Sequence, residues 1–526
     1  MIRLLGCKGV AILLVALALR LLWLDVKPPH FDEGVNGWFV DEMTRNGFYH
    51  YDPGNFHGPL HFYVLFVFQT LLGRAPWVLR LPVVLASTGC VALAIAFARH
   101  LDRRVCWIAA AAMAVSPGLV FYGRYAIHET WLLFFLMLTA WGIAEMWRYG
   151  SRAGLWTLGL GFTGMVLTKE TYIIHAVSLA AAFPTLLLFE KLTPSSILPK
   201  ARQIWKAGDA LGVAAVCIGS VLFFYTGGFL DSSSLSGLGM TFVRWFQTGT
   251  GGETGHEKEW SYWLQLMGRY EWPALAGVAG SLLLWRRCSD RLLRYLIVAA
   301  TGTLTVYSLI PYKTPWCLIV LIWPFFFAFG AAVIWMSERL DRWAVRGAAA
   351  LLCCLSLALC AQLNYRDFAK EDEPYVYVQT LPDIDKLIQP LRTLVARDAK
   401  NFHLIGHIVI PDVHPLPWLL GDFTHVNIHG VGELPNAPDA AFILIDDTLI
   451  EPLEPRLTEP YFKETLFIRG NAAETSVLYL SQRHFQACFP GRSPEFVPGV
   501  SAKLRLLDLN EAPDTDGTVP ADALDQ

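Results

Sequence analysis

Long apolar stretches recur along the first two thirds of the chain, separated by short segments rich in charged and aromatic side chains. Runs of about 18 or more apolar residues are long enough to cross a bilayer as helices. The pattern predicts eleven spans. Their limits are 4–24, 79–98, 105–122, 131–147, 154–168, 172–189, 209–227, 273–285, 294–311, 316–336 and 345–361. The apolar stretch 61–73 is shorter, and could cross the membrane or lie in its interface.

The composition agrees with a membrane chain. Of the 526 residues, 54% are hydrophobic and only 17% are charged, whereas soluble domains carry about 25% charge. The first span runs without a small-residue cleavage site into a polar segment, so it is predicted to be an anchor and not a signal peptide. We expect a polytopic α-helical membrane protein with about 11 to 12 transmembrane helices.

The Lys- and Arg-rich connections predict the topology. Basic residues concentrate in 99–104, 148–152, 191–206, 286–294 and 338–346. The positive-inside rule assigns these segments and the N-terminus to the cytoplasm. The remaining connections would then be exterior: the 26–78 loop, 121–130, Lys169-Glu170, 228–272 and Lys313. This parity holds only if 61–73 does not cross, so we predict an interfacial helix there.

The character of the chain changes after residue 362. Residues 363–526 contain 13 Lys and Arg against 25 Asp and Glu, a net charge of −12, and since the whole chain is −3 the preceding part carries +9. Strand-like runs at 403–410, 441–445 and 476–480 alternate with turn-rich segments. We predict a membrane domain over 1–362, an extracytoplasmic α/β domain over 363–509, and a disordered acidic tail over 510–526.

Several functional classes lack support in the sequence. Of the ten cysteines, only Cys488 falls in the exterior domain, and no disulfide framework or zinc spacing is present. There is no Walker loop or dinucleotide fingerprint, so an ATP-driven pump is disfavoured. No nucleic-acid partner is expected.

Two adjacent carboxylates, Asp32 and Glu33, follow the first span in a loop that also carries His57 and His61 among many aromatic residues. They could be a helix cap and a first-turn acid. Alternatively, one could remove a proton from a hydroxyl, because neighbouring carboxylates raise each other's proton affinity. Paired acids at a membrane boundary favour this catalytic interpretation.

A second cluster contains Arg124, His128 and Glu129. Arg124 and His128 are four residues apart, so on one helix they would share a face. The cluster could be an interfacial aromatic belt with a charged collar. With the Asp32 loop on the same side, it could instead form the opposite wall of a cleft.

Lys169 and Lys313 each lie in a tight connection between two spans. Lys169 could pair with Glu170, and Lys313 could simply extend to the interface. Together with Arg124, however, they could form a phosphate cradle. The glycine-containing segment 226–272 could be a lid or a connector.

The order of these motifs resembles the GT-C glycosyltransferases, particularly the protein O-mannosyltransferases and the aminoarabinose transferases of lipid A. The resemblance lies in the Asp-Glu pair, His57 to Tyr63, Arg80-Leu81-Pro82 and Leu167-Thr168-Lys169. Phe31 to Tyr51 and Tyr375 to Thr380 are similar to the flippase-activity-associated membrane protein family.

The resemblance implies a polyprenyl-phosphate sugar donor delivered from the bilayer, and Asp32 and Glu33 as the family's acids. It implies that Glu129 is the second-loop acid and that Lys169 binds phosphate, although relatives have Gly where this chain has Glu170. His57, His61, Arg124, His128 and Lys313 would contact substrate. No metal or other cofactor is required, since protein cations can stabilise the leaving group.

The sequence therefore predicts an inverting glycosyltransferase at the exterior face of the cell membrane, with a protein or glycolipid acceptor. The alternatives are a transporter or flippase-associated factor for lipid-linked saccharides, and a non-catalytic assembly factor. A transporter predicts charges at mid-span in two related halves. Here the charges cluster at one face and no internal repeat is evident, which favours the enzyme.

Overall fold

The structure is a computed structural model that describes residues 2–55, 57–191, 205–250, 255–285, 287, 290–470 and 475–499. The chain divides into two compact units, 1–379 and 380–526. The sequence placed the division after residue 362, which lies inside helix α17 (Arg342–Tyr365). The predicted tail, 510–526, lies outside the described residues.

The first unit is helical. Its α-helices in chain order are α1 (Ile2–Leu21), α2 (Phe31–Asn46), α3 (Leu60–Leu72), α4 (Pro76–Ala96), α5 (Arg103–Val115), α6 (Pro117–Tyr122), α7 (His128–Tyr149), α8 (Arg152–Val166), α9 (Tyr172–Glu190), α11 (Ala207–Tyr225), α12 (Leu235–Thr250), α13 (Tyr262–Tyr270), α14 (Trp272–Leu284), α15 (Arg291–Leu309), α16 (Leu318–Ser337) and α17. The short 3₁₀ segments are η1 (Phe97–Arg99), η2 (Ser232–Ser234) and η3 (Pro315–Cys317).

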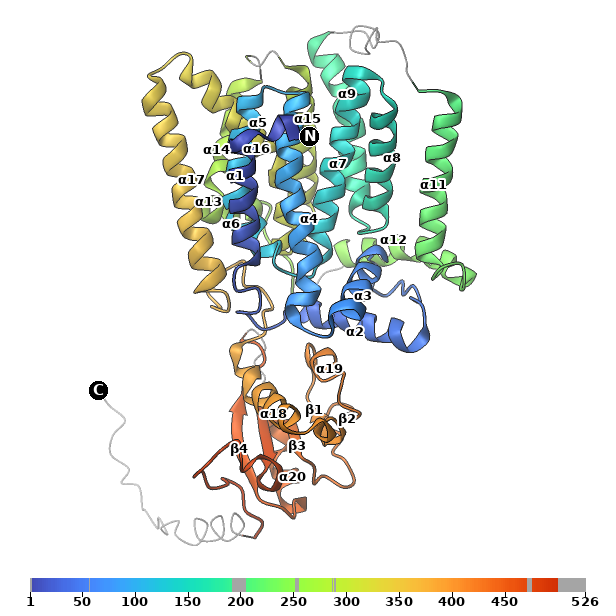
Figure 1. Cartoon of the computed structure of the whole chain (residues 1–526), viewed down its shortest axis with the longest axis vertical. Helices are drawn as coiled ribbons and strands as arrows, with labels where there is room; N and C mark the ends of the chain where they lie inside the picture. The colour runs from blue at the N-terminus through green and yellow to red at the C-terminus, as the bar shows by residue number, and fades with distance from the viewer. Residues whose placement is uncertain are drawn as a thin grey trace, which may run out of the picture. The chain divides into compact units, whose positions relative to one another are not determined.

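The long helices form a multi-pass membrane bundle. Among the described residues, seven helical stretches are long and apolar enough to cross a bilayer; they contain α4, α7, α9, α11, α15, α16 and α17. Figure 1 shows α7, α8 and α9 side by side, with α11 at one edge of the bundle and α17 at the other. Neighbouring helices enclose most of α16, whereas α11 and α17 expose long apolar surfaces that suit contact with lipid.

One predicted span is broken. The stretch 105–122 forms α5 and α6, which meet at Ser116. The Ser116 side chain accepts the Leu119 N–H and Pro117 is the first residue of α6. Both features are typical of a helix start, so the apolar run begins a new helix instead of continuing the old one.

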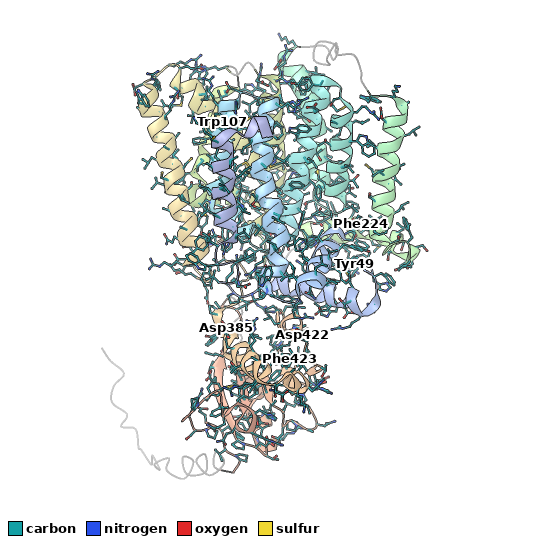
Figure 2. All side chains as sticks on the ribbon, viewed as in Figure 1. Tyr49, Trp107, Phe224, Asp385, Asp422 and Phe423 are labelled. Atoms are coloured by element: carbon teal, nitrogen blue, oxygen red, sulfur yellow. The ribbon has the colours of Figure 1, made fainter. Side chains whose placement is uncertain are left out.

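The segment 26–78, predicted as a loop, is largely helical because α2 and α3 occupy most of it. Their facing apolar side chains pack with Tyr49, Tyr51 and residues of α11 in one hydrophobic cluster. Figure 2 shows Tyr49 and Phe224 at the same end of the helical unit, and Trp107 at the opposite end. The 13 residues of α3 extend about 20 Å, less than the roughly 30 Å needed to cross alone.

The second predicted loop, 226–272, also contains helices. It holds η2, α12 and α13, although residues 251–254 within it are outside the described part. Trp263 and Met267 of α13 are fully buried in the main core. Their burial explains why this segment folds as part of the helical unit.

The second unit is an α/β domain with a five-stranded sheet in the order β2-β1-β3-β5-β4. The strands are β1 (Ile405–Val409), β2 (His425–Ile428), β3 (Phe442–Asp446), β4 (Tyr461–Leu466) and β5 (Ser476–Ser481). β1 pairs in parallel with β2 and β3, and β5 pairs antiparallel with β3 and β4. Its other elements are η4 (Pro382–Ile384), α18 (Asp385–Arg397), η5 (Ala399–His403), α19 (Leu416–Leu419), η6 (Asp447–Leu449), α20 (Ile450–Leu453), η7 (Glu454–Arg456) and α21 (Gln482–Phe485). The three strands expected from the sequence are present as β1, β3 and β5, while β2 and β4 were missed.

Candidate active site

The start of α2 fixes the two adjacent acids. His30 caps the helix: its Nδ1 accepts the Asp32 N–H at 3.1 Å, and Glu33 Oε2 accepts the His30 N–H at 2.9 Å. Such reciprocal bonds satisfy N–H groups that the first helical turn leaves without partners. The His30 Nε2 also lies 2.8 Å from the Tyr377 carbonyl oxygen. The Tyr377 contact holds the His30 ring, and the ring in turn holds the backbone of Asp32.

Glu33 is buried in an ion pair with Arg80 and does not line the cavity described below. Its carboxylate accepts two bonds from the Arg80 guanidinium, at 2.8 and 2.7 Å, and a third from the Ala126 N–H at 2.8 Å. Burial alone would raise the pKa of Glu33, but the charge and hydrogen bonds of Arg80, together with the Lys27 charge and the His30 N–H, outweigh burial and hold the pKa below its usual value. Glu33 is therefore an ionised anchor that ties α2 to α4.

A cavity of about 460 Å³ lies beside Asp32. Asp32 lines this cavity, and its side chain remains 35% exposed. The polar and charged side chains that line it are Asp32, Asn36, Asn55, His57, His128, Glu129, Lys169, Glu170, Thr171, Thr248 and Thr314. Five of the candidate residues from the sequence line this cavity: Asp32, His57, His128, Glu129 and Lys169.

Lys169 and Glu129 form a buried ion pair in the cavity wall. Lys169 lies in the tight turn between α8 and α9, and its Nζ donates to Glu129 Oε1 in the first turn of α7. Burial alone would lower the pKa of Lys169, but the Glu129 carboxylate raises it well above the usual value. The ion pair with Glu129 therefore favours the charged form of Lys169. The sequence had suggested a pair between Lys169 and the neighbouring Glu170. The structure instead pairs Lys169 with Glu129.

Glu170 pairs with His57 instead. The His57 Nδ1 and Glu170 Oε2 lie 2.9 Å apart. Burial would raise the pKa of Glu170, but the adjacent His57 and Lys169 hold it below its usual value. The cavity thus contains carboxylates at Asp32, Glu129 and Glu170.

Backbone pairing joins the first loop to the Lys169 turn. The Gly58 N–H donates to the Thr168 carbonyl and the Leu60 N–H donates to the Leu167 carbonyl, each at 3.0 Å. A Cβ at Gly58 would lie 2.3 Å from the Leu167 carbonyl carbon and oxygen. Only glycine permits this approach, which brings His57 next to Glu170.

His128 of α7 lies close to His57 and to His61 of α3. The His128 ring lies 4.6 Å from that of His57 and 4.4 Å from that of His61, measured between centroids. His61 does not line the cavity: its Nε2 contacts the Ala126 carbonyl oxygen at 3.0 Å, and burial lowers its pKa to about 4. His128 does line the cavity, and its buried Nε2 has no hydrogen-bond partner among the described residues.

Arg124 and Lys313 lie outside the cavity lining. The expectation that Arg124 and His128 share a helix face was wrong, since α6 ends at Tyr122 and α7 begins at His128. Arg124 donates to four backbone carbonyls at the end of α1 and just after it, those of Leu19, Arg20, Leu22 and Trp23. Lys313 Nζ donates to the Lys258 and Ile310 carbonyls. Both cations hold backbone carbonyls together, a use that isolated sequence motifs cannot distinguish from phosphate binding.

Sequence reasoning missed the aromatic half of the cavity. Trp245, Trp263 and Tyr307 line it together with Tyr312 and Trp316. Tyr312 and Trp316 lie in the Pro-bounded connection that had been noted only for its lysine. Trp263 and Tyr307 come from helices, where no local sequence signal separates a cavity aromatic from a core aromatic.

The comparisons with known proteins agree with this architecture. A family model described as dolichyl-phosphate-mannose-protein mannosyltransferase matches residues 56–224. Two crystal structures of ArnT from Cupriavidus metallidurans are similar over nearly their whole length. The one bound to undecaprenyl phosphate has 15% identity and a TM-score of 0.60, covering 90% of this chain and 98% of ArnT. The chain has the GT-C fold.

The apo ArnT structure gives the same GT-C likeness, with 14% identity, a TM-score of 0.55, and coverage of 91% of this chain and 97% of that one. No curated protein matches the chain in the sequence comparison. The resemblance to GT-C proteins predicted from the motifs is confirmed, while that to the flippase-activity-associated family stays a prediction.

Proposed function

We propose that this GT-C protein is an inverting glycosyltransferase that moves a sugar from a polyprenyl phosphate to an acceptor. The observation that carries the proposal is that Asp32 lines the same cavity as the buried Lys169–Glu129 pair. A carboxylate and a fixed cation in one cavity are the two groups that such a transfer needs. The similar ArnT structure holds bound undecaprenyl phosphate, which supports a polyprenyl carrier here.

Asp32 is the proposed general base. It accepts the proton of an acceptor hydroxyl while that oxygen forms a bond to the anomeric carbon of the sugar. The bond between the anomeric carbon and the phosphate oxygen breaks, and its electrons leave with the polyprenyl phosphate. A single displacement inverts the configuration at the sugar carbon. The capped start of α2 and the Glu33–Arg80 pair hold Asp32 in position.

Lys169 is the proposed contact of the leaving phosphate. An ammonium group has three donors, and the bond to Glu129 uses one of them. The other two are available to stabilise the charge that develops on the phosphate without any loss of the ion pair. Because Glu129 fixes the lysine before substrate binds, little reorganisation is needed during the reaction. His128 lines the same wall and is a second candidate for substrate contact.

The side of the membrane and the acceptor belong to the same proposal. The basic connections assign the Asp32 side to the exterior of the cell membrane, where a protein or glycolipid acceptor would be available. The bilayer itself delivers the carrier. Trp263 and Tyr307 line the cavity with aromatic surface, which is suited to contact the carrier's hydrocarbon chain.

Purified full-length protein, incubated with polyprenyl-phosphate sugars and an extract of membrane acceptors, tests this function. Release of free polyprenyl phosphate should accompany loss of the donor, because the bond between the anomeric carbon and the phosphate oxygen is broken. A transporter would move the intact donor across a vesicle membrane and release no free carrier. Translocation without cleavage of any donor would contradict the enzymatic proposal.

A further inference from the structure

A second hollow lies at the other end of α16 from the catalytic cavity. The cavity is lined by Trp316 and Cys317, next to the first residue of α16, whereas the second hollow is lined by Trp335, near its last. The separation between Trp316 and Trp335 corresponds to about 30 Å along the helix. The second hollow is therefore too distant to hold the phosphate of a donor in the catalytic cavity.

Among the described residues, two arginines and one tryptophan line this hollow of about 440 Å³. The Arg339 Cζ lies 4.2 Å from the centre of the Trp335 ring, and the Arg287 Cζ lies 5.0 Å from it. Arg287 follows the end of α14, where its N–H donates to the Leu284 carbonyl at 3.0 Å. Two guanidinium groups thus face one hollow and approach the same aromatic ring.

The positive charge in the hollow is weakly compensated. Within the described part of the chain, Arg287 makes no ion pair, and the only carboxylate within 4 Å of the Arg339 guanidinium is that of the adjacent Glu338, at 3.9 Å. The Arg339 Nη1 also donates to the Trp335 carbonyl, at 3.0 Å. Both members of that contact are half exposed, and Glu338 also lies 3.6 Å from Arg104. Exposed ion pairs of this kind contribute little. An anion that bridged both guanidiniums would relieve their mutual repulsion.

The location of the hollow near the end of a membrane span indicates which kind of anion would reach the two arginines. Trp335 lies near the end of the apolar stretch Pro315–Ser337, at the depth where tryptophans meet lipid headgroups. Leu340 and Trp343, which follow α16, are 60% and 67% exposed. They provide exposed apolar surface in the segment that follows Arg339. Guanidinium groups bind phosphate oxygens through paired N–H donors.

We propose that Arg287, Trp335 and Arg339 form a binding site for the phosphodiester headgroup of an anionic phospholipid. The guanidiniums contact the non-bridging phosphate oxygens, and Leu340 and Trp343 contact the upper part of the acyl chains. The site is independent of the catalytic cavity and of the proposed transfer reaction. It fixes the ends of α14 and α16 against the membrane surface through one shared ligand.

Lipid titration of the purified full-length protein, followed by native mass spectrometry, tests this site. The probes are phosphatidylglycerol, phosphatidylcholine with the same acyl chains, and inorganic phosphate. The double variant Arg287→Gln/Arg339→Gln should bind phosphatidylglycerol about thirtyfold more weakly than the wild type. The matched double variant Arg342→Gln/Arg346→Gln removes two arginines of neighbouring α17 that do not line the hollow, and should change binding only a few-fold.

Three results would overturn the proposal. Equal losses in the two double variants would indicate a diffuse effect of surface charge. Equal binding of phosphatidylcholine by the wild type would exclude recognition of an anionic headgroup. Full displacement of the lipid by inorganic phosphate at the lipid's own concentration would assign the hollow to a free anion. Trp335→Phe gives a second readout: brominated phosphatidylglycerol should quench less fluorescence in this variant than in the wild type.

Discussion

Asp32 and Glu33 are neighbours in the sequence, but their surroundings give them different roles. Asp32 lines the cavity and keeps about a third of its side chain exposed, whereas Glu33 is enclosed by Arg80 and backbone N–H groups. A general base must reach substrate, so of these two acids only Asp32 is placed for the proposed role. The sequence identified the pair but could not separate its members, because Arg80 is 47 residues away.

Glu33 should control the acid stability of the protein. Because Arg80 holds its pKa below the usual value, ionised Glu33 favours the folded state. This contribution is complete above the unfolded pKa and is lost as the pH falls through the folded pKa. Melting temperatures measured from pH 7 to pH 3 should fall with acid.

The matched variants for this measurement are Glu33→Gln and Glu371→Gln. Breaking a buried ion pair costs about 3–5 kcal/mol, so Glu33→Gln should melt well below the wild type at pH 7 and lose less on acidification. The exposed Glu371 should change neither value appreciably. A wild-type acid profile in Glu33→Gln would show that this carboxylate is not responsible.

Lys169→Gln should weaken donor binding more than it slows the chemical step, because the donor phosphate is already negatively charged before transfer and the proposed contact with Lys169 exists in the bound ground state. A hydrogen bond to a charged group contributes about 1.5–3 kcal/mol, equivalent to roughly tenfold to more than a hundredfold in affinity. Donor affinity can be measured by titration with a non-transferable polyprenyl phosphate.

The double variant Lys169→Gln/Glu129→Gln provides the control. It removes both members of the buried pair and so should recover stability without recovering donor affinity. If affinity returned together with stability, Lys169 would have only a structural role.

At the scale of elements, the contact between the first loop and the α8–α9 turn organises the site. Gly58→Ala should greatly reduce transfer, because the new Cβ would overlap the Leu167 carbonyl and separate the two backbones. His57 would then lose its position beside Glu170.

Gly268→Ala is a suitable comparison for that variant. Gly268 lies within α13, and a Cβ there would meet nothing within 4 Å. Transfer rates of the two variants should therefore differ strongly at similar expression. Wild-type activity in Gly58→Ala would show that this close approach is dispensable.

Local patterns predicted the long apolar helices well, because each buries or exposes a continuous hydrophobic stretch that periodicity detects. They failed for α2, which has no long apolar run. Its polar residues are buried by contacts with distant parts of the chain, as when Asn36 donates to the Ala126 carbonyl. The strands β2 and β4 were also missed. β2 has mostly exposed residues and β4 carries Lys463 and Glu464, so neither shows a clear apolar run.

At the scale of the whole molecule, the fold class was predictable because hydropathy and composition indicated a polytopic membrane protein with an α/β domain, and the order of the motifs resembled that of GT-C proteins. The site was only partly predictable. Cationic side chains look alike in a sequence whether they face a cavity, as Lys169 does, or bind backbone carbonyls, as Arg124 does. The partner that decides between these roles lies far away along the chain.

The topology remains a prediction at this scale. Cysteines introduced at Asn46 and Val431, both exposed, should react with an impermeant reagent in intact cells. A cysteine at Trp343, 67% exposed near the basic connection, should react only after permeabilisation. The background should lack the exposed native cysteines Cys7 and Cys354. Labelling of Asn46→Cys without Val431→Cys would contradict a common exterior side.

Donor turnover by Asp32→Asn, compared with Asp25→Asn, tests the central claim most directly. Asn keeps the size of the side chain but cannot accept the acceptor's proton as a base. Asp25 is an exposed acid shortly before α2 that does not line the cavity. We expect Asp32→Asn to bind donor normally and to release polyprenyl phosphate at least about a hundredfold more slowly, while Asp25→Asn matches the wild type. Near-normal release by Asp32→Asn would contradict the assignment of this cavity as the active site with Asp32 as its base.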